Sequence, residues 1–254
     1  MTRFNTEAIV IAATPMGESD RLVRMITPGQ GRLAAVVKGA LRSKTRFAGL
    51  FDTCQLINAG FMTAPRSGRL MIEHADLVNG FPALRKSAQR LGRASLLLEM
   101  VNLSVAEEET AQGAFNILLS GLSRLNQEPD SDRWAIAYSF RLLAVSGYRP
   151  LLDSCSCCSS IKLSRNTIFD ATSGGLLCGP CGPEGGQTDR PDILSVSADT
   201  VKTLCAIMDA QESMVGRINF TRNSLEQARN LLKAFIAYQL AAPSRVIPFL
   251  EKVA

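Results

Sequence analysis

The first eighty residues alternate between short apolar runs and turn-forming residues. Each run is rich in Val, Ile, Phe or Met and is bounded by glycine, proline or charged residues, as is typical of β-strands. The pattern predicts five strands, over Thr6–Ala13, Arg21–Thr27, Arg32–Lys38, Cys54–Met62 and Leu70–Val78. Five short strands with a long connection after the third fit a small barrel, and the OB-fold is the commonest nucleic-acid binder of this kind. An SH3-like barrel would give much the same pattern.

The hydrophobic period changes to that of a helix from Pro82 onward. Apolar residues then recur every three or four positions, as expected for amphipathic helices. The pattern predicts a first helix over Ala83–Ala106 and a last one over Arg245–Val253. Between them it predicts a helix capped by Thr110, one capped by Ser131 and ending near Ser146, one capped by Ser197 and ending near Ala210, and one from Asn223 to about Ala241. Pro82 fits a first helical turn, where a missing N–H costs nothing. Asn223 followed by Glu226 resembles a capping box.

These elements predict an α+β multidomain chain. Residues 1–80 would form a five-stranded OB-fold β-barrel that binds nucleic acid. Residues 81–254 would form an α-helical domain, interrupted at about 153–187 by a cysteine-rich insert. With 254 residues, the chain is long enough for two domains of roughly 100–200 residues each.

Positive charge is concentrated near the start of the chain, although the net charge is only +5. A local basic cluster indicates a polyanionic partner such as nucleic acid. Asp20 is the only acidic residue from Asp20 through Phe51, and the cations that we expect to contact DNA are Arg21, Arg24, Arg32, Lys38, Arg42, Lys44 and Arg46. The alternative is a solvated surface loop. The same choice, a solvated face or a second DNA contact, applies to Arg85, Lys86, Arg90 and Arg93.

The sequence argues against several other classes of protein. The apolar run from Ala8 to Ala13 is too short for a signal peptide, and no run reaches the ~18 residues of a membrane helix. We therefore expect a cytoplasmic protein that does not bind membranes. Phosphate-loop, dinucleotide, nucleophile-elbow and metalloprotease motifs are absent. With His74 as the single histidine, the sequence predicts a binding protein and not an enzyme.

Four cysteines are spaced as in a structural zinc site. Cys155 and Cys158 precede Cys178 and Cys181 in a C-x2-C-x19-C-x2-C pattern. This spacing is typical of tetracysteine zinc sites, in which two tight turns bring the sulfurs into a tetrahedron. Two apolar runs between the pairs, Thr167–Phe169 and Gly175–Leu177, could form a hairpin. Cys157 is a fifth cysteine that could replace a neighbour as ligand.

A redox role for the second cysteine pair is the competing hypothesis. Cys178-Gly-Pro-Cys181 is identical to the redox tetrapeptide of thioredoxins, where a following helix lowers the pKa of the first cysteine. Here Gly182-Pro183-Glu184-Gly185-Gly186 follows, and this run cannot propagate a helix. A third class, an interaction scaffold whose barrel binds protein and not DNA, also fits the pattern.

Several spaced motifs together resemble the RecO family of bacterial DNA repair and recombination mediators. Near the N-terminus these are Gly17–Val23, Gly31-Arg32-Leu33, Lys38-Gly39-Ala40, Arg42-Ser43-Lys44 and Arg46–Gly49. In the second half, Arg141-Leu142-Leu143, Gly147-Tyr148 and Pro150 are followed by the two cysteine pairs. Two positions depart from the family pattern, the extra Cys157 and Ser159 in place of a glycine.

The resemblance implies more than the residue patterns do. It implies an N-terminal OB-fold, a helical domain with a zinc site in many members, and a place at the nucleoid in recombinational repair of DNA damage. It also implies binding to single- and double-stranded DNA, annealing of complementary strands, and help in loading the recombinase. The implied protein partners are RecR and the C-terminal tail of the single-stranded-DNA-binding protein.

Overall fold

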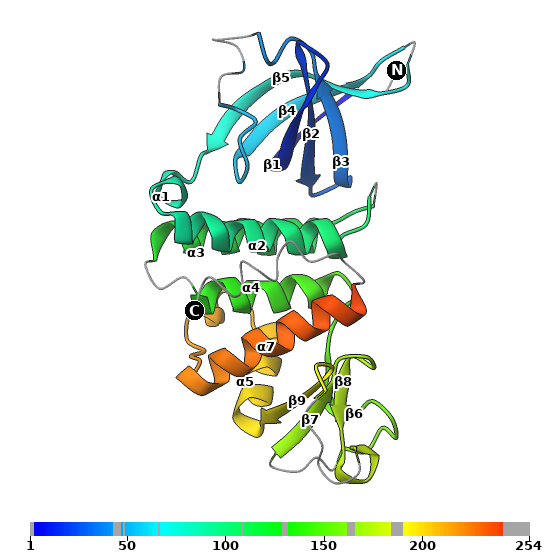
Figure 1. Ribbon diagram of the computed structural model, residues 1–254. Helices are drawn as coiled ribbons and strands as arrows, with labels where there is room; N and C mark the ends of the chain where they lie inside the picture. Colours follow the sequence, from blue (N-terminus) through cyan, green and yellow to red (C-terminus); the bar gives the residue numbers. More distant parts are fainter. Residues whose placement is uncertain are drawn as a thin grey trace. The chain divides into compact units, whose positions relative to one another are not determined.

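Figure 1 shows the computed structural model of the chain, a β-barrel and sets of helices with a small second sheet. The structure describes residues 3–42, 47, 49–65, 67–107, 109–128, 132–161, 166–183 and 190–240. Packing divides the chain into two compact units, Met1–Pro129 and Asp130–Ala254. The first unit contains the barrel together with the helices that follow it. Each unit is described by itself below.

Five strands close into a barrel in the first unit, which confirms the predicted barrel architecture. They are β1 (Arg3–Met16), β2 (Asp20–Thr27), β3 (Gly31–Val37), β4 (Leu56–Thr63) and β5 (Leu70–Asn79). The strand order around the barrel is β1-β2-β3-β5-β4. All neighbours pair antiparallel except β3 and β5, which pair parallel at Val36 and Met71. The predicted strands match with differences of a few residues at their ends.

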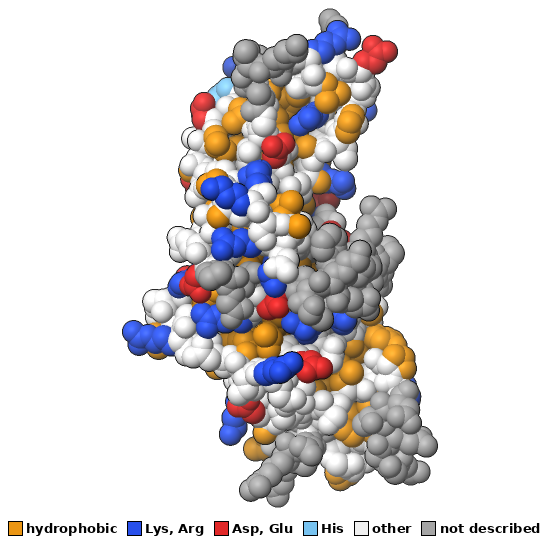
Figure 2. Space-filling view, turned by 60° about the vertical axis from the view of Figure 1, so that its left-hand side comes forward, with side chains coloured by type: hydrophobic (Ala, Val, Ile, Leu, Met, Phe, Trp, Pro, Cys, Tyr) orange, Lys and Arg blue, Asp and Glu red, His pale blue; other side chains and the backbone are white. Residues whose placement is uncertain are grey.

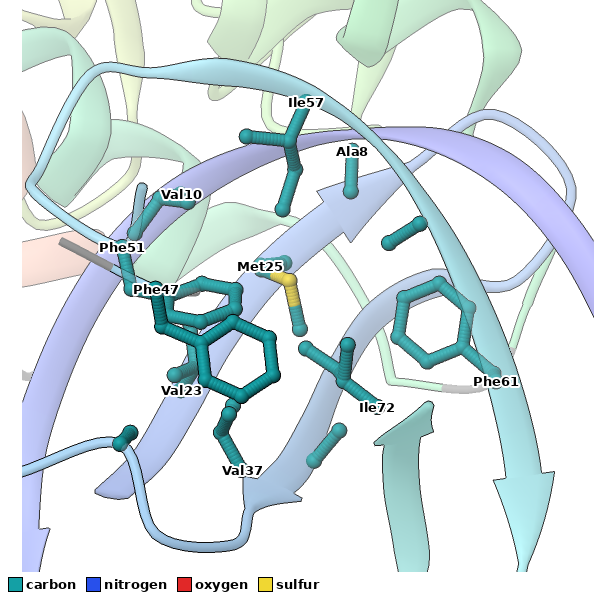
Figure 3. Close-up of a cluster of buried hydrophobic side chains, with 13 residues drawn as sticks. Ala8, Val10, Val23, Met25, Val37, Phe47, Phe51, Ile57, Phe61 and Ile72 are labelled. Carbon is teal, nitrogen blue, oxygen red and sulfur yellow. The ribbon is translucent and has the colours of Figure 1, made fainter. Parts of the chain in front are cut away.

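The barrel core is built from the inward-facing residues of every strand. Alternate positions of a strand point to opposite faces, so one side chain in two enters the core. Figure 3 shows Met25 near the centre of this cluster, and the rings of Phe47 and Phe51 beside Val23. The two rings lie 5.6 Å apart between centroids and are 5% and 1% exposed. The long connection after β3 therefore supplies part of the core.

The structure has two helices where the sequence predicted one continuous helix over Ala83–Ala106, so the prediction of a single helix was wrong. The short helix α1 covers Pro82–Arg85, with Pro82 in its first turn as predicted, and α2 covers Ala88–Ser104. Ser87 lies between them in an extended conformation, and its side chain accepts a hydrogen bond from the backbone N–H of Arg90. Ser87 therefore caps α2, because its hydroxyl bonds the backbone at the start of this helix. The spacing of apolar residues does not reveal such a cap.

The third helix of this unit, α3 (Gln112–Gln127), carries the predicted apolar stripe, which is buried. Its predicted cap was wrong, because Ala111 occupies the cap position and makes no side-chain cap bond. The hydroxyl of Thr110 instead donates to the carbonyl of Gly29 at 3.5 Å. Contact with the turn before β3 has replaced local capping.

Helices α2 and α3 pack against the outside of the barrel, on β1 and β2 respectively. On the outer face, Ile26, Ile9 and Leu56 pair across β2, β1 and β4, and they are at most 5% exposed. Burying such side chains stabilises by about 1.5–3 kcal/mol each. This outward apolar row explains why the helices belong to the same compact unit as the barrel.

The second unit combines helices with a four-stranded sheet. Its sheet order is β6 (Leu151–Cys155), β8 (Gly175–Leu177), β7 (Asn166–Asp170) and β9 (Ile193–Ser197). The antiparallel β7–β8 pair is the hairpin expected between the cysteine pairs, whereas β6 and β9 were not predicted. The helices are α4 (Asp132–Val145), α5 (Ala198–Asp209), α6 (Glu212–Val215) and α7 (Arg222–Gln239).

Of the predicted helix caps in this unit, one is confirmed and one is wrong. Ser197 caps α5 as expected and accepts a hydrogen bond from the N–H of Thr200. The expected Asn223 cap was wrong, because Thr221 caps α7 two residues earlier and accepts from the N–H of Ser224. The predicted cap at Ser131 and the predicted helix over Arg245–Val253 fall outside the described residues. None of the described helices has the length and apolar character that crossing a bilayer requires.

We expect Gly31→Ala to destabilise the first unit strongly. Gly31 has a φ of +57°, and a Cβ there would lie 2.3 Å from the carbonyl oxygen of Glu109. The left-handed backbone and the clash with fixed backbone should together lower the free energy of unfolding by about 2 kcal/mol or more. Urea unfolding of both proteins measures this difference.

Gly29→Ala is the matched control, because Gly29 lies in the same turn with no atom within 4 Å of the added methyl. Its unfolding midpoint should stay close to that of the unsubstituted protein. Equal midpoints for the two variants would contradict the role given to Gly31.

Candidate nucleic-acid interface and metal centre

The second unit brings four cysteines together at one end of its sheet. Cys155 ends β6, and the N–H of Ser159 donates to its carbonyl at 2.9 Å, closing a tight turn around Cys158. Cys178 follows β8 and leads into the short 3₁₀ helix η1 (Gly179–Cys181). Each pair of cysteines therefore sits on its own turn, and the pairing of β6 with β8 sets the turns side by side.

The four sulfur atoms lie within 4.8 Å of one another. The sulfurs of Cys158 and Cys178 are 3.6 Å apart, close to the edge of about 3.8 Å that a tetrahedron with metal–sulfur bonds of about 2.3 Å requires. Cys155 is buried and accepts a hydrogen bond from the N–H of Cys178 at 3.3 Å. This donor set is complete for a closed tetrahedral site.

The electrostatics of the cluster also favour a bound cation. The N–H of Cys178 lowers the pKa of the Cys155 thiol to about 6, because it donates to the charged form. The neighbouring sulfurs, that of Cys178 first, raise the pKa of Cys181. Four thiolates at this distance repel one another unless a metal ion neutralises them, so the cluster could hold a metal ion.

The local fold around Cys181 differs from that of a redox motif. After η1 the chain is extended at Gly182, with φ −71° and ψ 167°, so the described residues that follow the second cysteine do not continue η1 as a helix. All the cysteines are free thiols. Cys157 is exposed and lies near Cys181, where it helps to raise the pKa of the Cys181 thiol. It is not one of the four clustered sulfurs.

Three of the predicted DNA-binding cations lie where β2 begins and β3 ends. Arg21 pairs across the strands with Val37, and Lys38 follows directly. Lys38 is exposed and makes no hydrogen bond or ion pair with any residue that the structure describes. Arg42 lies 3.7 Å from Glu18, but both groups are mostly exposed. A pair of this kind contributes about 0–1 kcal/mol, so Arg42 stays available to a ligand.

Asp20 fixes the backbone beside these cations. Its carboxylate accepts hydrogen bonds from the N–H of Gly39 and the hydroxyl of Ser19, both at 2.9 Å. The bond from Gly39 is the main reason that the pKa of Asp20 is lowered. The N–H of Leu41 also donates to the carbonyl of Ser19 at 2.9 Å. The segment after β3 is thereby tied to the β1–β2 turn.

The remaining predicted cations do not join this group. Arg24 is exposed on the outer face of β2, opposite Ala34. Arg32 lies at the other end of β3, where its guanidinium donates to the carbonyl of Val105 and to the side chain of Asn102 and lies 3.5 Å from Glu107. Lys44 and Arg46 fall outside the described residues.

The cations around α1 and α2 take part in holding the unit together. Arg85 donates to the carbonyls of Gly80 and Thr53, and Arg90 donates to the carbonyl of Asn126 at 3.0 Å. These contacts favour a structural role for both residues over a second DNA contact. Lys86 is exposed.

The sequence did not predict the groove that lies beside Lys38. A groove of about 590 Å³ is lined by the apolar residues Met16, Val36, Met62 and Met71 and by the cations Lys38 and Arg69. These apolar residues read as core positions of strands, and only the barrel register shows which of them face outward. Figure 2 shows such a mixture of apolar and cationic side chains on one face of the barrel, in the upper part of the view.

Comparison with known proteins agrees with this architecture. The family model for the N-terminal domain of recombination protein O matches residues 1–81, and the model for its C-terminal domain matches residues 85–246. The DNA repair protein RecO of Myxococcus xanthus is 30% identical over 253 residues, which covers 100% of this chain and 99% of the relative. The protein of the same name from Syntrophus aciditrophicus is 28% identical over 249 residues, covering 98% and 95%. The chain therefore belongs to the RecO family of DNA repair proteins.

Proposed function

We propose that this protein is a DNA-binding recombination mediator that does no bond-breaking itself. It would bind single- and double-stranded DNA, anneal complementary strands, and assist recombinase loading onto DNA coated by the single-stranded-DNA-binding protein. The observation that carries this proposal is the pair of exposed cations Lys38 and Arg42, which lack strong internal partners and follow β3 at one end of an OB-type barrel, beside the half-buried Arg21, in a chain of the RecO family. RecR, the tail of the single-stranded-DNA-binding protein and the site of action at the cytoplasmic nucleoid are proposed from the family alone.

The proposed contact is with the sugar–phosphate backbone. Arg21, Lys38 and Arg42 lie at one end of the β2–β3 hairpin, with Arg24 further along β2, and Lys44 and Arg46 complete the proposed set. Neutralising six phosphates would give a log–log salt slope of about −4 on single strands, at roughly 0.7 per contact. Such contacts carry no sequence information, so binding would be nearly independent of sequence.

Annealing follows from the same electrostatics. Two complementary strands repel each other through their phosphates, and a cationic surface that holds both lowers this repulsion. Base pairing then provides the specificity, and the protein needs no catalytic group. This agrees with a barrel end whose described residues show cations and a carboxylate that fixes the backbone.

The metal centre is proposed to be a structural zinc site. Four cysteine sulfurs leave no open coordination position, so a bound Zn²⁺ would supply cross-linking and no Lewis-acid chemistry. Cys155 and Cys158 would tie the end of β6 to Cys178 and Cys181 after β8. Binding of this kind is worth about 10–16 kcal/mol in apparent terms, which can order a small sheet.

The double substitution Lys38→Glu/Arg42→Glu should weaken DNA binding for all sequences alike. Two lost phosphate contacts should flatten the single-strand salt slope by about 1.4, and affinity at low salt should fall by tenfold or more. Fluorescence anisotropy titrations at several salt concentrations, on single strands and duplexes, measure both quantities.

Lys202→Glu/Arg222→Glu is the matched control, since it changes the net charge equally at exposed positions of α5 and α7. Its binding should remain close to that of the unsubstituted protein. If the barrel variant bound DNA with unchanged affinity and slope, the assignment of Lys38 and Arg42 would be refuted. No binding by the unsubstituted protein at low salt would favour a scaffold that binds protein.

Arg32→Gln should affect stability and leave the salt slope unchanged. The Arg32 side chain is 22% exposed, and its guanidinium joins β3 to the end of α2. Losing charge-assisted hydrogen bonds at such a site costs about 1.5–3 kcal/mol of unfolding free energy. Urea unfolding measures this cost. A flattened salt slope of DNA binding in the same variant would instead show that Arg32 contacts DNA.

The protein purified without chelator should contain about one zinc atom per chain, and Cys178→Ser should contain almost none. Mass spectrometry of the metal content measures both values. Loss of the metal should also loosen the β6–β8 end of the sheet, which hydrogen exchange of the backbone amides reports.

Cys157→Ser is the control, because Cys157 lies outside the group of four sulfurs. It should retain the full zinc content. A protein that contains no metal and has a reducible Cys178–Cys181 disulfide would support the redox hypothesis in place of the zinc site.

A further inference from the structure

An apolar row crosses the outside of the barrel where water-facing side chains would be expected. Val36 of β3 pairs with Met71 of β5, and Met71 pairs with Met62 of β4. Their sequence neighbours Val37, Ile72 and Phe61 are in the barrel core, so strand alternation points the row outward. A barrel face exposed to water usually carries polar residues at such positions.

The barrel has a second outward apolar row, and the two rows differ in how completely they are buried. Ile26, Ile9 and Leu56 form the row on the side where α2 and α3 pack, and they are almost completely buried. In the second row Val36 is also buried, but Met62 and Met71 stay partly exposed, and all three line the groove of about 590 Å³ described above. This volume is in the range of ligand pockets, about 300–1,000 Å³.

Charge at the groove identifies the chemistry of its occupant. Lys38 and Arg69 line it with Ser67, and both cations are exposed and form no ion pair with any residue that the structure describes, although Asp20 attracts Lys38 electrostatically. Asp20 also lines the groove, but its carboxylate is engaged by the N–H of Gly39 and the hydroxyl of Ser19. A groove lined by apolar side chains and two cations suits a ligand with flat apolar faces attached to anionic groups.

We propose that this groove holds the unpaired bases of single-stranded DNA on Met62, Met71 and Val36, while Lys38 and Arg69 hold the flanking phosphates. The inference rests on the proposed DNA-binding function and deepens it, because it separates single strands from duplexes. The groove lies between the β1–β2 turn and the β4–β5 hairpin, the two loops that border the oligonucleotide face of OB-folds.

Methionine can take the part that aromatic side chains usually play in such sites. The two phenylalanines of the long connection are in the core and cannot stack on a base. A thioether is polarisable and makes favourable contacts with aromatic rings, and its three rotatable bonds let it adapt to any base. Purines and pyrimidines would both fit, so sequence preference stays weak. A duplex hides its base faces in the stack and would meet the cations only.

The test compares single strands with duplexes of the same sequence in anisotropy titrations. Met62→Thr/Met71→Thr keeps residues that strands favour but removes two of the apolar side chains that line the groove. Single-strand affinity should fall about tenfold, which corresponds to about 1.4 kcal/mol, and duplex affinity should change by less than about twofold. Met71→Leu, which keeps an apolar side chain, should retain most of the binding.

Leu77→Thr is the matched control, since Leu77 is 50% exposed on the same strand and does not line the groove. It should leave binding to both forms of DNA unchanged. Single-strand affinity of the double variant equal to that of the unsubstituted protein would overturn the groove proposal, whereas the effect of Lys38→Glu/Arg42→Glu would still support DNA binding. Absence of any DNA binding by the unsubstituted protein would end both proposals.

A second measurement does not depend on substitution. The chain has eight methionines, so methyl-labelled methionine gives a simple NMR spectrum. Adding a single-stranded oligonucleotide should shift the methyl signals of Met62 and Met71 and leave those of the fully buried Met25 and Met100 in place. Adding the duplex should shift none of them. Shifts of equal size with both forms of DNA would contradict base binding in the groove.

Discussion

The arrangement of the first unit depends on the burial of Phe47 and Phe51 in the barrel core. Both rings come from the long connection between β3 and β4, and each is almost inaccessible to water. Burial of an aromatic ring contributes about 1.5–3 kcal/mol, enough to hold this connection against the barrel. At its other end the loop is fixed by the bond from Gly39 to Asp20. The cationic segment is therefore attached to the barrel at both ends.

The junction between barrel and helices uses a different kind of contact. Gly31 admits the carbonyl of Glu109 because it has no side chain, and Arg32 then reaches the end of α2 with its guanidinium. A charge-assisted contact of this kind fixes direction more strongly than apolar packing does. Two arginines of the same basic stretch thus have different roles, because Arg32 stabilises the fold and Arg24 faces the solvent.

The two units use different means to become compact. The first closes a barrel around a continuous apolar core and adds helices on one outer row. The second has a short sheet in which β8 has only three residues, and its cysteine cluster lies at the end of that sheet. Short strands bury little apolar area, so a metal cross-link would add the order that packing does not supply.

The sequence by itself determined the features that depend on local pattern. Alternating apolar residues located the five strands, and cysteine spacing located the tetrad, because periodicity and ligand spacing are properties of neighbouring residues. Only the tertiary structure decided which outward apolar row the helices cover, that Arg32 binds α2, and that Ser87 and Thr221 cap their helices. Those outcomes depend on strand register and on contacts between residues far apart in the chain. Because Met62 and Ile26 both read as core in a strand pattern, only packing separates the exposed groove from the buried face.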